Sequence, residues 1–226
     1  REIALSFGCR VISIEQFSYG RAINIGLREA KSNYVLILSA HAVPIGIDFF
    51  KSSIKFFENS KNIAAIRYIN NFENYKRALS NNFEVQDPLK FGFNAACGMV
   101  NRKVWQSNHF DEELTALEDK EWSKRVMDKG FKILEINQTY YYFLKRTMRQ
   151  EVKRFKIETE ASCRLNNQSY YTSSYLLAGF IKKVFIVNTR KYFQGLKRDI
   201  LLLQSKLQIS KNIKESHRKT HFYPKN

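Results

Sequence analysis

The stretch YVLILSAHAVP, residues Tyr34 to Pro44, decides the fold class of this 226-residue chain. Its first five residues are a continuous apolar run, which is typical of a β-strand buried on both faces. Upstream, residues 21–31 mix apolar and polar positions as an amphipathic helix does, and residues 10–14 form a short β-branched run. The order strand, helix, strand predicts a βαβ unit with parallel strands and a right-handed crossover.

The pattern of strands and helices continues downstream to about residue 145. Residues 70–92 are polar and irregular, so we expect a long active-site loop there. The other expected elements are helices at 48–59, 102–107 and 118–129, strands at 63–69, 132–136 and 140–143, and a small-residue segment at 94–100. We therefore predict an α/β domain over residues 1–145, with a mostly parallel sheet flanked by helices. Residues 146–226 are expected to form a basic helical region, broken at 166–174.

Charge is distributed unevenly along the chain. The net charge is +17, of which residues 1–143 carry only +3 and the remaining residues carry +14. A neutral body with a cationic end indicates that this end meets an anionic surface. The three cysteines lie far apart with no CxxC spacing, so neither a disulfide framework nor a zinc site is indicated, and a reducing cytosol fits best. No signal peptide opens the chain, and Lys182 and Lys183 interrupt the longest apolar stretch, so we expect no membrane-spanning helix.

Three segments in this order resemble the family 2 glycosyltransferases, which have the GT-A fold. They are FSYGRAINIG at 17–26 with SAHAVP at 39–44, NAACGMVNR at 94–102, and FDE at 110–112 followed by Glu118-Asp119 and Trp122. The resemblance covers roughly residues 1–145. It implies an inverting enzyme that moves a sugar from a nucleotide-diphosphate sugar to a hydroxyl acceptor in bacterial surface polysaccharide synthesis. The strands that precede residue 1 in the family have no counterpart, so the chain is expected to be truncated at its N-terminus.

The resemblance implies that Asp119 is the catalytic general base and that Glu118 orients the acceptor or the loop. A carboxylate at a helix N-terminus is favoured in its charged form, which keeps it ready to accept a proton. Acidic residues in a first helical turn also serve simply as caps, and this alternative stays open for both residues.

The cation site departs from the family pattern. Many relatives carry Asp-x-Asp at the end of the strand, where carboxylates suit Mg²⁺ or Mn²⁺ bridging a diphosphate. Here the matching residues are Ser39 and His41. Either His41 binds a divalent cation, for which Mn²⁺ suits imidazole better than Mg²⁺, or it contacts the diphosphate directly. In a third interpretation, His41 is a polar residue at the end of the strand and binds no metal.

The remaining donor-binding residues also follow from the resemblance. Arg21 and Asn24 are expected to line the nucleotide side, and the small size of Asn94 and Ala95 would let the backbone approach the donor sugar. Against this, Arg21 could be an ordinary solvated charge, and small residues also serve helix–sheet packing.

The basic region has two readings. In the first, an amphipathic cationic helix with aromatic residues suits an anionic membrane surface. The enzyme is then expected to be cytoplasmic, to lie peripherally on the inner face of the cell membrane, and to act on a saccharide or lipid-linked acceptor. The helix could instead pack on the body. Two other functions remain as alternatives, a basic nucleic-acid-binding protein and a non-catalytic glycosyltransferase remnant. No nucleic-acid-binding motif accompanies the charge, so no nucleic-acid partner is expected.

Overall fold

The computed structural model describes residues 1–59 and 61–220, with side chains up to residue 212. The chain divides into two compact units, Arg1–Gln168 and Ser169–Asn226. The first unit therefore continues beyond the boundary predicted at residue 145, because helix α8 (Met148–Leu165) belongs to it.

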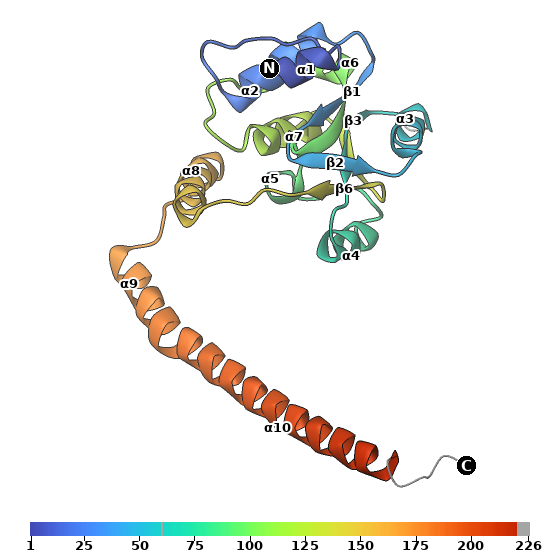
Figure 1. Cartoon of the computed structure of the whole chain (residues 1–226). Helices are drawn as coiled ribbons and strands as arrows, with labels where there is room; N and C mark the ends of the chain where they lie inside the picture. The colour runs from blue at the N-terminus through green and yellow to red at the C-terminus, as the bar shows by residue number, and fades with distance from the viewer. Residues whose placement is uncertain (60, 221–226) are drawn as a thin grey trace, which may run out of the picture. The chain divides into compact units, whose positions relative to one another are not determined.

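A four-stranded sheet lies at the centre of the first unit (Figure 1). The strand order is β1 (Tyr34–Leu38), β4 (Cys97–Asn101), β3 (Ile63–Tyr68) and β5 (Lys132–Ile136). Strand β4 is antiparallel to both of its neighbours, and β3 pairs with β5 in parallel. Three of the four strands thus run in the same direction, in line with the predicted α/β class. A second sheet pairs β2 (Ala42–Ile45) with β6 (Thr139–Tyr142) in antiparallel fashion.

Helices and two hydrophobic cores cover the two faces of the four-stranded sheet. One core joins Leu27 of α2, Trp105 of α6 and Trp122 of α7 to alternate residues of the strands. The other joins Phe49 and Phe57 of α3 to the opposite strand faces. The bounds are α1 Glu2–Ser6, α2 Tyr19–Glu29, α3 Phe49–Asn59, α4 Phe72–Ser80, α5 Pro88–Phe91, α6 Arg102–Gln106 and α7 Glu118–Asp128. Alternate side chains of a strand point to opposite faces of the sheet, and both faces are covered here. Strand β3 is therefore buried along its whole length.

Two expectations about local structure are wrong. Residues 10–14 form no strand; Val11 and Ile12 are exposed, and Arg10 instead makes an ion pair with Glu29 at the end of α2. A β-branched run needs a neighbouring strand to become part of a sheet, and this run has none among the residues described. Residues 70–92 are not one irregular loop, because they contain α4 and α5.

Side-chain caps explain the two helices within residues 70–92. Asn71 accepts a hydrogen bond from the backbone N–H of Asn74 at the start of α4, and Asp87 accepts one from that of Lys90 at the start of α5. Pro88 follows Asp87 in the first turn, where its missing N–H costs nothing. The segment is therefore ordered by its own capping residues.

The second unit is helical. It consists of α9 (Ser173–Lys182), the π-helical turn η1 (Lys183–Asn188) and α10 (Thr189–Thr220). The break predicted at residues 166–174 is present, because α8 ends at Leu165 and α9 begins at Ser173. Large apolar side chains from Tyr175 to Ile209 are exposed along these helices. Across the residues that the structure describes, no helix combines the length and the apolarity that a membrane span requires.

Candidate active site

Most of the residues predicted to be catalytic or donor-binding, except Arg21 and Asn24, lie at one end of the four-stranded sheet. The backbone N–H of Ser39, just after β1, donates to the carbonyl of Ala96 (2.9 Å). The neighbouring N–H of Ala95 donates to Oδ2 of Asp119 (3.3 Å). The loop of residues 94–96 therefore lies between the carboxyl end of β1 and the start of α7. Ser39, Ala95 and Asp119 are thereby brought together although they are distant in sequence.

A buried ammonium group stands beside Asp119. The Nζ atom of Lys120 lies 3.5 Å from Oδ2 of Asp119 and donates to the carbonyls of Gly92 (3.1 Å) and Phe93 (2.6 Å). Burial lowers the pKa of Lys120, and the adjacent Asp119 carboxylate opposes this effect. Lys120 thus fixes the segment that leads into residues 94–96 and supplies positive charge next to the Asp119 carboxylate.

Glu118 occupies a very different environment from that of its neighbour. Its side chain is buried, and burial, reinforced by the negative charge of Asp119, raises its pKa to about 7. The preceding residue, Leu117, has a φ of 63°, in the left-handed region that leucine rarely adopts, and it offers no side-chain cap to α7. Such backbone conformations cost about 1–3 kcal/mol and cluster at functional sites.

Asn94 is held in place by its own hydrogen bonds. Its Oδ1 accepts the N–H of Ala96 (3.1 Å), and its Nδ2 donates to the hydroxyl of Tyr140 (3.0 Å). The same hydroxyl accepts from Nδ2 of Asn70 (3.1 Å), ahead of α4. Burial raises the pKa of Tyr140 to about 12, so this phenol stays protonated. The network ties the loop of residues 94–96 to β6 and to the segment before α4.

A second buried network supports the segment before Asn94. Arg67 of β3 donates to the carbonyls of Phe91 and Gly92, the latter at 3.3 Å. Its Nε lies 3.6 Å from the buried carboxylate of Glu135, which also pairs with Arg77 of α4. Sequence patterns gave no signal for Arg67 or Lys120, because a charged residue in a strand or a first helical turn is usually solvated, and none for the hydroxyl of Tyr140, whose partners are distant in sequence. Their role depends on tertiary contacts.

His41 lies next to this group of residues. Its backbone N–H donates to Oγ of Ser39 (3.3 Å), its carbonyl accepts from the N–H of Phe143, and its exposed ring meets Tyr142 edge to face. The described residues contain no group of three or more His, Cys, Asp or Glu side chains placed to hold a metal ion.

Arg21 and Asn24 lie elsewhere, against the segment at 110–112. Asn24 is 2% exposed, and its amide bonds the backbone of Phe110, the indole of Trp105 and Glu112. Since these bonds occupy its polar atoms, Asn24 has a structural role, and the expected contact with a donor is not supported. Nε of Arg21 pairs with Glu112 (3.0 Å).

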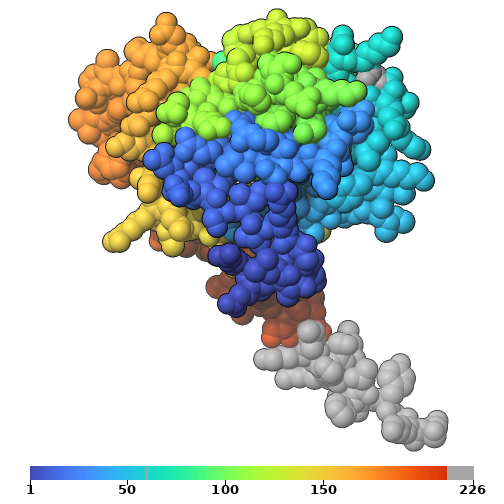
Figure 2. Space-filling model, turned by 90° about the horizontal axis from the view of Figure 1, so that it is seen from above, coloured from blue at the N-terminus to red at the C-terminus, as the bar shows by residue number. Residues whose placement is uncertain are grey.

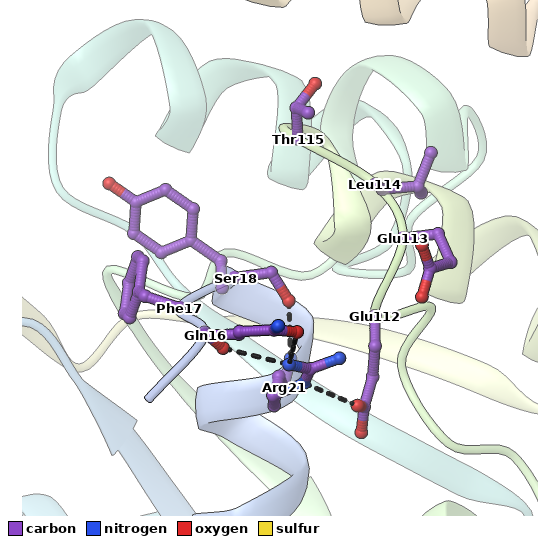
Figure 3. Close-up of a pocket in the computed structure, with 9 residues that line it drawn as sticks. Gln16, Phe17, Ser18, Arg21, Glu112, Glu113, Leu114 and Thr115 are labelled. Atoms are coloured by element: carbon purple, nitrogen blue, oxygen red, sulfur yellow. Dashed lines mark hydrogen bonds and ion pairs between the residues drawn. The ribbon is translucent and has the colours of Figure 1, made fainter. Parts of the chain in front are cut away.

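The side chains of Gln16, Phe17 and Tyr19 flank Arg21 around an open cavity of about 390 Å³ (Figure 3). Glu112, Glu113, Leu114 and Thr115 line its other side. Figure 2 shows the N-terminal segment and the green region, which includes residues 110–115, side by side on one face of the molecule. The segment 110–115 leads directly into α7, so this cavity adjoins the element that carries Asp119.

The first unit has a GT-A-like glycosyltransferase fold. Its sheet order and flanking helices agree with this fold, as does the loop of residues 94–96, which lies in space between the end of β1 and the start of α7. A mannosyltransferase from Pyrobaculum calidifontis, solved with GDP-mannose and Mn²⁺, superposes with a TM-score of 0.54 over 72% of this chain and 47% of its own, at 15% identity. Glucosyl-3-phosphoglycerate synthase from Mycobacterium tuberculosis, in complex with phosphoglyceric acid, superposes with a TM-score of 0.55 over 75% of this chain and 65% of its own, at 13% identity.

A further structure of the same synthase contains Mn²⁺, UDP-glucose and phosphoglyceric acid, and its TM-score is 0.54 at 11% identity. The chain spans between about half and two thirds of the length of these structures. No protein-family model matches the sequence, and comparison with curated proteins finds no match. At these identities the likeness establishes the fold.

Proposed function

We propose that this chain is part of an inverting, family 2-like glycosyltransferase that moves a sugar from a nucleotide-diphosphate sugar to a hydroxyl acceptor, with Asp119 as the general base. The observation that carries the proposal is the contact between Asp119 and the loop of residues 94–96, which is in turn bonded to Ser39. In this arrangement the Asp119 carboxylate lies on one side of the loop of residues 94–96, and the end of β1 lies on the other. A general base and a diphosphate must lie on two sides of a donor sugar in the same way.

In the proposed reaction, the acceptor hydroxyl attacks the anomeric carbon of the donor from the side opposite the diphosphate. The new oxygen–carbon bond forms as the bond from the anomeric carbon to the diphosphate oxygen breaks. The hydroxyl proton passes to Asp119, and the bonding electron pair leaves with the diphosphate. Inversion follows from this single displacement. Lys120 acts by position, since it holds the carbonyls of Gly92 and Phe93 and so keeps residues 94–96 in register with Asp119.

We infer that a divalent cation, Mn²⁺ or Mg²⁺, accompanies the donor. His41 would hold it together with diphosphate oxygens, and the cation would neutralise the charge that develops on the leaving group. The exposed ring of His41 beside Ser39 supports this assignment.

The acceptor and the setting complete the proposal. A saccharide or a lipid-linked saccharide is the proposed acceptor, and bacterial surface polysaccharide synthesis is the proposed process. A cytoplasmic location on the inner face of the cell membrane fits the positive charge that is concentrated after residue 143.

A matched pair of variants on α7 tests the catalytic assignment. Asp119→Asn should lower the release of nucleoside diphosphate from UDP-glucose or GDP-mannose by about 10²–10⁴-fold, while calorimetric binding of the nucleotide is retained. Asp128→Asn, at the exposed end of the same helix, should behave as the wild type. Turnover by Asp119→Asn at the wild-type rate would disprove the role of this carboxylate. A wild-type chain that neither binds nor cleaves nucleotide sugars would be a non-catalytic remnant, which contradicts the proposal.

A further inference from the structure

The second unit carries one continuous apolar stripe along α10. Phe193, Leu196, Ile200, Leu203 and Leu207 recur at spacings of three and four residues, and Tyr192 lies four residues before Leu196, which places all of them on one side of the helix. Each of these side chains is exposed, from 44% for Leu196 to 68% for Tyr192. An exposed apolar stripe of this length marks a surface that interacts with a partner.

Cationic side chains border the stripe on both sides. With 100° of rotation per residue, Lys197 falls beyond one edge of the stripe and Lys206 beyond the other, and Arg198 lies on the opposite side of the helix. Between residues 169 and 212 there are eight Lys or Arg residues and a single acid, Asp199, which lies at the same edge of the stripe as Lys206. Long cationic side chains at the edges of an apolar face can extend their charged ends to lipid headgroups while the apolar face is buried.

A second copy of this helix fits the stripe less well. Phe193, Leu196, Ile200, Leu203 and Leu207 follow the a and d positions of a heptad repeat, which would place Lys206 opposite Lys211 of a second helix in a parallel pair. Asp199 would face Gln204 and so would form no ion pair across the interface. The charge pattern thus opposes a parallel pair of two copies, whereas it complements an anionic lipid surface.

We propose that α10 docks on an anionic membrane surface, with the stripe from Tyr192 to Leu207 in the interfacial layer and the bordering Lys and Arg residues on the headgroups. Helix α9 and η1 precede it with further exposed aromatic and aliphatic side chains, including Tyr175, Phe180 and Phe185, and only Lys182 and Lys183 as charges. This inference deepens the peripheral location proposed above. It makes no use of Asp119 or of sugar transfer, so the two proposals can fail independently.

Co-sedimentation of the full chain with lipid vesicles tests the inference. The chain should bind vesicles of phosphatidylcholine and phosphatidylglycerol and should bind pure phosphatidylcholine at least tenfold more weakly. Each cation near the surface contributes about fivefold in affinity, so the double variant Lys197→Gln, Lys206→Gln, which removes the two cations that border the stripe, should bind about 25-fold more weakly. Equal binding to the two kinds of vesicle would overturn the proposal.

Two double variants of equal composition test the position of the stripe. Leu196→Ser with Leu203→Ser, both within the stripe, should weaken binding at least tenfold. Leu201→Ser with Leu202→Ser, both outside it, should change binding by less than about threefold. Circular dichroism checks that both variants remain helical. An equal loss in the two variants would contradict the assigned face. A concentration-dependent dimer in light scattering without vesicle binding, or salt-sensitive binding to DNA with none to vesicles, would overturn the proposal in favour of another partner.

Discussion

Replacement of Glu118 by Gln separates the two adjacent acids of α7 by their response to pH. Burial raises the pKa of Glu118 to about 7 in the folded protein, against 4.5 for an unperturbed glutamate. Because the folded value is the higher one, the protonated form favours folding. Stability from this group is complete below about pH 4.5 and is lost as the pH rises towards 7. The difference corresponds to about 3 kcal/mol at pH 8.

The variant Glu118→Gln carries no ionisable group at this position, so it should avoid that loss. We expect the free energy of unfolding of the variant, relative to the wild type, to rise by about 3 kcal/mol between about pH 4.5 and 8. Urea unfolding followed by tryptophan fluorescence is the assay. Trp105 and Trp122 are the two tryptophans of the chain and are both buried in the first unit, so the signal reports on that unit alone.

The matched control is Glu113→Gln, which changes an exposed carboxylate in the segment that leads to α7. Its difference from the wild type should stay within about 0.5 kcal/mol over the same pH range. A constant difference for Glu118→Gln, or a wild type that gains stability relative to this variant as the pH rises, would refute the placement of Glu118 in a buried site.

Three further predictions concern the framework of the site, each measured by the same urea unfolding assay. Tyr140→Phe removes the hydroxyl that accepts from two amides and should lower the free energy of unfolding by about 1–3 kcal/mol; no change would show that water satisfies both amides. Glu135→Gln leaves the buried guanidinium group of Arg67 and the part-buried one of Arg77 poorly compensated and should cost about 3–5 kcal/mol, whereas a loss below 1 kcal/mol would contradict the network. A Cβ at Gly20 would collide with the backbone of Asp111, so Gly20→Ala should destabilise the protein. A Cβ at Gly26 meets open space, so Gly26→Ala should stabilise the protein by about 0.5–1 kcal/mol. Equal effects of the two substitutions would exclude this packing.

Local patterns were sufficient for most of the elements but not for their pairing. The apolar run of β1 and the amphipathic pattern of α2 predicted both elements within two residues. The small-residue segment at 94–100 gave no sign that its second half is β4, inserted antiparallel between β1 and β3. Periodicity records which side chains are buried, and it carries no information on the direction of a neighbouring strand. The missed helix α4 did have a local signal, in the cap formed by Asn71.

The placement of the candidate site residues was predictable in part, whereas their roles stay predictions. Glu118, Asp119, Asn94, Ala95, Ser39 and His41 meet at one end of the sheet, as the order of the segments indicated. Asn24 and Arg21 were assigned to the donor from their place before β1, but both bond to residues 110–112. A buried amide and a solvated one look identical in a sequence. The contacts of Lys120 with two carbonyls were likewise invisible before the chain was folded.

A crystal structure of the chain with uridine diphosphate and Mn²⁺ bound would test whether His41 and Asp119 share one donor site. We expect the diphosphate and an anomalous manganese signal beside His41, with the Asp119 carboxylate facing the same space across residues 94–96. A nucleotide bound only in the cavity beside Arg21, with no manganese signal at His41, would contradict this expectation.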